Sequence, residues 1–249
     1  MPVDHTPPFQ LSSLIVIVGH YGVGKTNLAL NLARIQRASC EKAAPVSRQT
    51  IIDLDIVNPY YRTSDYEKEL AAAGIQLLGP SYSDTTLDTP SLMPGIDTSI
   101  AQASAGHPVI VDVGGDPDGA RALARFAPAI NGHPDCTVIY VVNSARPEIA
   151  KPDDAVALLG EIEATANIKA THIAGNTHLK EHTTPEVVAA SVPYVQSVAR
   201  LAKLPVAFIT APRPCVSEAK ALLPPDLDPT SILPVDTLVG NTWEDLAPL

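Results

Sequence analysis

Residues 19–26 have the composition and spacing of a loop that wraps phosphate groups. They read Gly-His-Tyr-Gly-Val-Gly-Lys-Thr and fit the pattern G-x-x-x-x-G-K-[ST]. The glycines let consecutive backbone N–H groups turn inward around an anion, and a helix behind the loop adds its positive dipole end. We expect Lys25 to neutralise β- and γ-phosphate oxygens during catalysis, and the Thr26 hydroxyl to coordinate Mg²⁺. The residues that this pattern predicts to bind nucleotide are His20, Tyr21, Gly22, Val23, Gly24, Lys25, Thr26 and Asn27.

Acidic residues at the ends of two later apolar runs supply the carboxylates that a magnesium–nucleotide site requires. Asp112 lies in the run 109–113, directly before a glycine pair that leaves room for a phosphate. We predict that it holds a water on Mg²⁺. Asp53 and Asp55 lie at the end of the run 50–54, where one of them can orient an attacking water. For each of these acids, capping of the next turn is the alternative role.

The apolar runs are short and rich in β-branched residues, and each is followed by a stretch long enough for a helix. This alternation predicts an α/β fold of three layers, with a mostly parallel sheet of about seven strands between helices. The strands are expected at 14–18, 50–54, 75–78, 108–113, 137–142, 170–174 and 206–210. The helices are expected at 25–38, 65–73, 95–105, 120–127, 153–165 and 185–204, with Pro193 kinking or splitting the last one.

The order of the motifs resembles the MinD/ParA/CobQ group of P-loop ATPases, within the SIMIBI class. The phosphate loop comes first, then D-L-D-I-V-N-P-Y-Y-R after the second strand, then D-V-G-G-D after a later one. The likeness covers about residues 14–210 and is greatest to a bacterial subfamily with a G-H-Y-G-x-G-K-T loop. It implies that Asp55 positions the attacking water, that Asp53 supports the metal with Thr26 and Asp112, and that Asn176 reads the adenine base.

One residue departs from that group. Its dimeric members carry a second lysine early in the phosphate loop, which reaches the partner's nucleotide, and His20 stands at the matching position. A histidine can donate a hydrogen bond to phosphate, most readily when protonated. The missing charge can instead come from an arginine acting as an arginine finger, and the sequence leaves Arg62, Arg121 and Arg146 as candidates.

Composition limits the classes of partner and the compartment. The chain has 249 residues, a net charge of −10 and a pI near 5.0, which argues against nucleic acid and anionic lipid as partners. It contains no apolar run long enough to span a bilayer and no signal peptide pattern, so we expect a cytoplasmic protein without stable membrane anchoring. We expect one domain, with its core at about 14–210, a Pro-rich arm at 1–12 and a C-terminal tail at 211–249.

These features favour a Mg²⁺-dependent ATPase that binds ATP and ADP and switches a partner protein through assembly, activation or maturation. GTP is disfavoured because the sequence contains neither N-K-x-D nor T-K-x-D. A nucleotide-dependent homodimer stays open because of His20. Two other functions also stay open. One is an ATP-dependent ligase or kinase for small molecules, resembling dethiobiotin synthetase, and the other is an ATP sensor with little hydrolysis.

Overall fold

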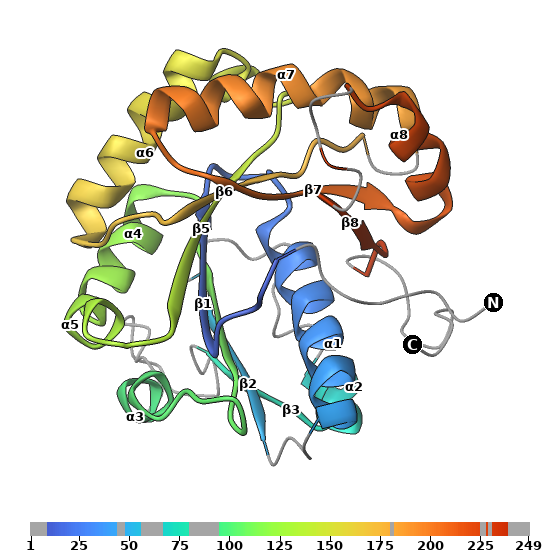
Figure 1. Cartoon of the computed structure of the whole chain (residues 1–249). Helices are drawn as coiled ribbons and strands as arrows, with labels where there is room; N and C mark the ends of the chain where they lie inside the picture. The colour runs from blue at the N-terminus through green and yellow to red at the C-terminus, as the bar shows by residue number, and fades with distance from the viewer. Residues whose placement is uncertain are drawn as a thin grey trace.

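All the strands that the structure describes lie in one parallel sheet of eight, in the order β3-β2-β4-β1-β5-β6-β7-β8 (Figure 1). The structure is a computed structural model, and it describes residues 9–43, 48–55, 67–79, 95–179, 182–224, 228 and 231–238. The strands are β1 (Leu14–Gly19), β2 (Gln49–Leu54), β3 (Ile75–Leu78), β4 (Val109–Val113), β5 (Cys136–Val142), β6 (His172–Gly175), β7 (Val206–Pro212) and β8 (Ile232–Val235). The helices are α1 (Lys25–Ala43), α2 (Glu67–Ala72), α3 (Ile96–Ala101), α4 (Pro117–Ala124), α5 (Ala127–Asn131), α6 (Pro152–Ala166), α7 (Pro185–Ala202) and α8 (Val216–Leu222), with short 3₁₀ turns η2 (Pro147–Ile149) and η3 (Arg213–Cys215).

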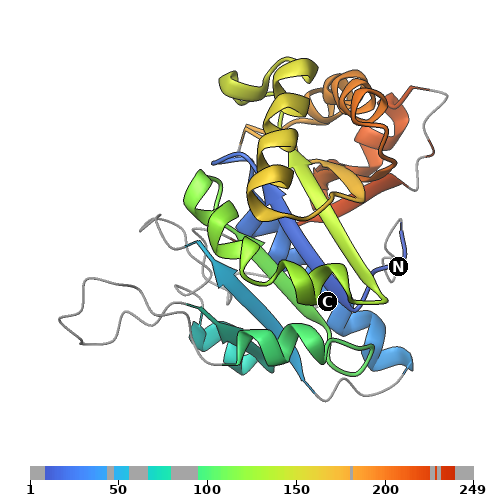
Figure 2. The same ribbon diagram turned by 90° about the vertical axis from the view of Figure 1, so that its left-hand side faces the viewer.

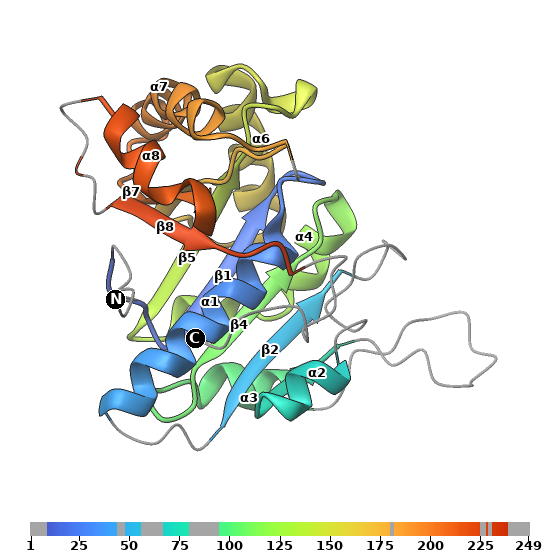
Figure 3. The same cartoon turned by 90° about the vertical axis from the view of Figure 1, so that its right-hand side faces the viewer.

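Helices cover both faces of the sheet. Helix α1 packs on β1, β2 and β4, and it stands in front of these strands in Figure 3. Figure 2 shows α4, α5 and α6 in front of the strands from the other side, where α4 contacts α6 and α6 contacts α7. The strands β1, β2 and β4 are buried along their whole length, as expected for strands covered on both faces. None of the described helices has the length and apolar character needed to cross a membrane.

The three-layer α/β fold predicted from the sequence is confirmed, and each of the seven expected strands is present within two residues of its expected ends. Several helix predictions were wrong in detail: the helix expected at 25–38 extends to Ala43, and the one expected at 95–105 ends at Ala101. The helix expected at 120–127 is two helices, because Asp116 caps α4 and Pro117 starts it three residues earlier, while Pro128 opens α5. Of the two alternatives predicted at Pro193, the split is wrong, because α7 runs without a break from Pro185 to Ala202 and Pro193 is exposed on its surface.

The described part of the predicted C-terminal tail, at 211–249, contains helical segments and a strand rather than extended chain alone. Residues 213–222 form η3 and α8, and β8 adds an eighth strand beside β7 at the edge of the sheet. At the other end, the Phe9 ring packs 5.6 Å from the Phe208 ring, so the described part of the N-terminal arm also lies against the sheet. Residues 1–8 and 239–249 lie outside the described residues.

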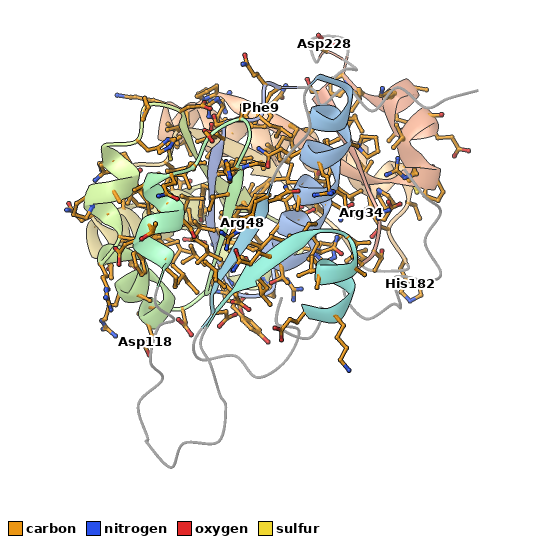
Figure 4. All side chains as sticks on the ribbon, turned by 90° about the horizontal axis from the view of Figure 1, so that it is seen from below. Phe9, Arg34, Arg48, Asp118, His182 and Asp228 are labelled. Atoms are coloured by element: carbon orange, nitrogen blue, oxygen red, sulfur yellow. The ribbon has the colours of Figure 1, made fainter. Side chains whose placement is uncertain are left out.

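Polar side chains of α1 hold the segment that follows β8. Asn31 accepts a hydrogen bond from the Asp236 N–H at 2.8 Å and donates to the Asp236 carbonyl at 2.9 Å. Asn27 donates to the same carbonyl at 3.0 Å and accepts from the Leu238 N–H at 2.8 Å. The Asp236 carboxylate receives Arg213 at 3.0 Å and Arg34 at 3.4 Å (Arg34 is labelled in Figure 4). These contacts fix the chain directly after β8 against α1.

Replacing Asn31 by Ala should therefore lower the free energy of unfolding by about 1–3 kcal/mol, because the partly buried Asp236 N–H and carbonyl both lose their partner on the buried Asn31 side chain. Urea denaturation followed by circular dichroism measures the loss. Asn131→Ala is the matched control, since Asn131 is an exposed helical asparagine with a single side-chain hydrogen bond, to Asn167. Its change should stay within about 0.5 kcal/mol. Equal losses in the two variants would show that α1 does not depend on the 236–238 segment.

Candidate functional site

The phosphate loop lies where the sequence predicts it, between β1 and α1 at the carboxyl edge of the sheet. Gly22 and Gly24 have φ angles of +72° and +88°, a region that residues with a side chain rarely adopt. Helix α1 begins at Lys25 and has no acidic residue in its first turn, whereas α4, α6 and α7 each have one or more there. The positive end of its dipole is therefore not neutralised by its own side chains, which suits an anion.

The Lys25 ammonium is buried inside this loop. Only 7% of the residue is exposed, and Nζ donates hydrogen bonds to the carbonyls of Gly19 at 3.1 Å and His20 at 3.0 Å. Burial lowers the pKa of Lys25 below its ordinary value, and the negative charges of Asp112, Asp55 and Asp116 oppose that shift. The four groups thus form one electrostatic cluster around the loop.

Thr26 and Asp112 are in direct contact, as the predicted magnesium–nucleotide site requires. The Thr26 hydroxyl donates to Asp112 Oδ2 at 2.7 Å, and Asp112 is 2% exposed. Asp53 on β2 is the register partner of Asp112 on β4, so the two carboxylates leave the same face of the sheet side by side. This oxygen donor set fits Mg²⁺, which keeps several waters and takes few protein ligands. Among the described residues, no three His, Cys, Asp or Glu side chains form a group that could hold a metal ion by themselves.

Asp53 and Asp55 have different surroundings. Asp53 is 1% exposed, and its Oδ1 accepts the Asp55 N–H at 2.9 Å, so it fixes the backbone that carries Asp55. Asp55 is only partly buried, and its Oδ1 lies 3.4 Å from the position that a Cβ on Gly114 would occupy. Asp55 thus borders the loop after β4 and acts electrostatically on Lys25. Residues 56–66, which follow it and include Arg62, lie outside the described residues.

The glycine pair after Asp112 lets the β4 loop touch the phosphate loop. A Cβ on Gly115 would stand 2.5 Å from both N and Cα of Tyr21, and 2.8 Å from the Lys25 ammonium. Asp116, which follows, accepts the Gly119 N–H at 2.7 Å and caps α4. Its influence on Lys25 was not anticipated from the sequence, although its place directly after the glycine pair offered a signal.

Asn176 closes the site from β6. Its Nδ2 donates to the Val23 carbonyl at 2.7 Å, and its Oδ1 accepts the Thr210 hydroxyl at 2.5 Å. A Cβ on Gly24 would meet Asn176 Nδ2 at 2.5 Å and His178 Nε2 at 2.9 Å. Sequence reasoning placed Asn176 here but missed Thr210, which lies near the carboxyl end of β7, and His178, which follows β6; their only signal was this position near the ends of strands.

Three other predicted nucleotide-binding residues have contacts of their own. His20 Nδ1 donates to the Tyr21 carbonyl at 2.9 Å, so this ring nitrogen contacts its own loop. Tyr21 is 54% exposed. The Asn27 side chain binds residues 236–238, as described above.

Comparison with known proteins bears on the fold. No protein-family model matches the sequence, and no curated protein matches it. Among solved structures, FtsY from Mycoplasma mycoides is similar with a TM-score of 0.51 and 14% sequence identity, over 83% of this chain and 63% of that one. The chain thus spans less than two thirds of that protein's length. FlhF complexed with GTP and Mg²⁺ is similar with a TM-score of 0.51 and 15% identity, over 83% of this chain and 68% of that one.

Both neighbours are P-loop nucleoside triphosphatases of the SIMIBI class, the wider class that also contains the MinD/ParA/CobQ group. Identities this low speak for the fold, and they do not distinguish the narrower group. The chain therefore has the three-layer α/β fold of the P-loop nucleoside triphosphatases.

Proposed function

We propose that the protein is a Mg²⁺-dependent ATPase that works as a switch on a partner protein. The observation that carries this proposal is the hydrogen bond between the Thr26 hydroxyl and Asp112, next to the buried Lys25 ammonium. A phosphate loop alone could be a glycine-rich turn. A loop whose hydroxyl meets a strand-end carboxylate has the two groups that hold a magnesium–triphosphate complex.

Each residue has a distinct role in the proposed reaction. Thr26 would coordinate Mg²⁺, and Asp112 would hold its waters with support from Asp53; the metal supplies positive charge to the phosphates. Lys25 would exchange its carbonyl partners for phosphate oxygens. Asp55, partly exposed at the border of the Gly114 loop, would orient the attacking water.

ATP rather than GTP is the proposed nucleotide. The sequence after β6 reads Asn176-Thr-His-Leu179, without the lysine and aspartate of the guanine-reading motifs. Asn176 remains the proposed adenine-reading residue. To read a base, its amide would have to exchange the Val23 carbonyl for the adenine edge while keeping the Thr210 hydroxyl.

The switch would act through the loops after β2 and β4. Asp55 directly follows β2, and Gly115 lies after β4 against Tyr21 of the phosphate loop. Both positions are close to Lys25, so a terminal phosphate held by Lys25 would contact both loops at once. Loops ordered by a terminal phosphate and released by its hydrolysis form a two-state surface for a partner. A second copy of the chain is one such partner.

Lys25→Ala should weaken Mg-ATP binding by at least about 100-fold, because several charge-assisted hydrogen bonds are lost.

Asp55→Ala should keep Mg-ATP binding and lower kcat by about 100-fold or more, which is the usual contribution of a group that handles the attacking water's proton. Calorimetry and phosphate release measure the two effects. Lys169→Ala and Asp118→Ala are the controls, because each removes an exposed charged side chain that is paired with another residue. Normal hydrolysis by Asp55→Ala would refute its assigned role.

Gly115→Ala should weaken Mg-ATP binding by about tenfold or more, because the added methyl group would overlap the Tyr21 backbone. Calorimetric titration of the folded variant measures it. Gly106→Ala is the matched control, since a Cβ there meets nothing within 4 Å. Unchanged affinity in Gly115→Ala would mean that the β4 loop does not shape the phosphate site.

Light scattering after size exclusion tests the switch. We expect a monomer with Mg-ADP and a dimer with a Mg-bound nonhydrolysable ATP analogue, because only the analogue carries a terminal phosphate to order both loops. The same mass in both states would count against a homodimeric switch. It would favour the small-molecule enzyme or the ATP sensor.

A further inference from the structure

We infer that Arg146 contacts the nucleotide's phosphates from within the same chain. Its guanidinium would supply the positive charge that the second phosphate-loop lysine supplies in the resembling group, where this chain has His20. This inference rests on the proposed function and adds a residue to it. Of the three arginines that the sequence leaves open, Arg62 lies outside the described residues. Arg121 forms an ion pair with Asp118 on the exposed side of α4. Figure 4 shows Asp118 at the outer surface of the molecule.

Arg146 lies against the phosphate loop. A Cβ added to Gly22 would stand 2.9 Å from the guanidinium carbon Cζ, 3.1 Å from Nη2 and 3.2 Å from Nε. The absence of a side chain at Gly22 is thus what admits the guanidinium. Gly22 is the middle of the loop: Tyr21 before it touches Gly115, and the carbonyl of Val23 after it binds Asn176.

The backbone that carries Arg146 is fixed by hydrogen bonds. Its N–H donates to the Asn143 carbonyl at 3.1 Å, and its own carbonyl accepts from Ile149 at 3.1 Å. The Asn143 side chain accepts the Ala145 N–H at 2.9 Å, and the Ser144 N–H donates to the Thr177 hydroxyl at 3.1 Å. This turn follows β5, the direct neighbour of β1, so the sheet sets the distance from Arg146 to the loop.

Donors of this turn lack acceptors in the part of the chain that the structure describes. Arg146 Nε is buried and has no hydrogen-bond partner there, and the same holds for Asn143 Nδ2. No described carboxylate forms an ion pair with Arg146. A buried guanidinium N–H without an acceptor is unfavourable, and phosphate oxygens match its geometry and charge.

The contact would act on the charge that develops during hydrolysis. The water oxygen forms a bond to the γ-phosphorus, and the bond from that phosphorus to the β–γ bridging oxygen breaks. The bonding pair leaves with ADP, one water proton stays on inorganic phosphate and the other goes to solvent. A guanidinium beside Gly22 would stabilise the charge on the phosphate oxygens, which is the role of an arginine finger.

Steady-state hydrolysis and calorimetry on the full chain test this inference. Arg146→Ala should lower kcat by about 100-fold or more, with KM and Mg-ADP affinity within about threefold of wild type. Binding of Mg-ADP with aluminium fluoride, which mimics the charged transition state, should fall with kcat. Arg146→Lys should recover part of both, since it keeps the charge and loses the fork of donors. Arg121→Ala, the matched control, should behave as wild type.

Two results would overturn the inference alone. One is an Arg146→Ala variant with wild-type kcat and wild-type affinity for the aluminium fluoride complex. The other is an equal loss of Mg-ADP affinity and kcat, which would show that Arg146 only supports the shape of the loop. A wild-type protein that binds no Mg-nucleotide would overturn the proposed function as well, so the two failures are distinguishable.

Discussion

The burial of the Lys25 ammonium is the constraint on which the candidate site depends. A cation removed from water is stable only where other groups replace its hydration, and an uncompensated one costs several kcal/mol. Here the Gly19 and His20 carbonyls accept its hydrogen bonds, and carboxylates from β4 and from the loops after β2 and β4 supply opposite charge. The strand order makes this possible, because β4 lies between β1 and β2 and brings both acidic strand ends to the lysine.

A second constraint is steric. Three segments from different strands reach the phosphate loop only because glycine occupies the contact point. Arg146 approaches at Gly22, Asn176 and His178 approach at Gly24, and the β4 loop approaches through its own Gly115. A methyl group at any of these points would stand within 3 Å of a neighbouring atom. The pattern of glycines therefore specifies which segments pack against the loop at residues 19–26, in addition to letting the backbone turn.

The sequence predicted the parts of the structure whose cause is local. Apolar runs located seven strands, and the spacing of Gly19, Lys25 and Thr26 located the loop and its helix. The meeting of Thr26 with Asp112 also followed from the pattern, because both lie at the same edge of a parallel sheet. The sequence did not predict which of the three arginines lies at the loop, because four strands, β2 to β5, separate Arg146 from Gly22 in the chain. Only the pairing of β5 with β1 brings them together.

Strand β8 shows most clearly why the rest was not predictable. Its four residues include Pro234, and the chain around it is rich in proline, which signals a coil. Its position is stabilised by Asn27 and Asn31, which lie more than 200 residues earlier, and by an Asp236 carboxylate shared between two arginines. In the sequence, two asparagines four residues apart on a helix indicate only a polar helix face, so the spacing of Asn27 and Asn31 does not reveal their contact with residues 236–238. Because Asn27 directly follows Thr26, the first turn of α1 presents the Thr26 hydroxyl to Asp112 and the Asn27 amide to residues 236–238. One helical turn therefore has to satisfy both the phosphate site and the edge of the sheet, and only the folded arrangement reveals that double requirement.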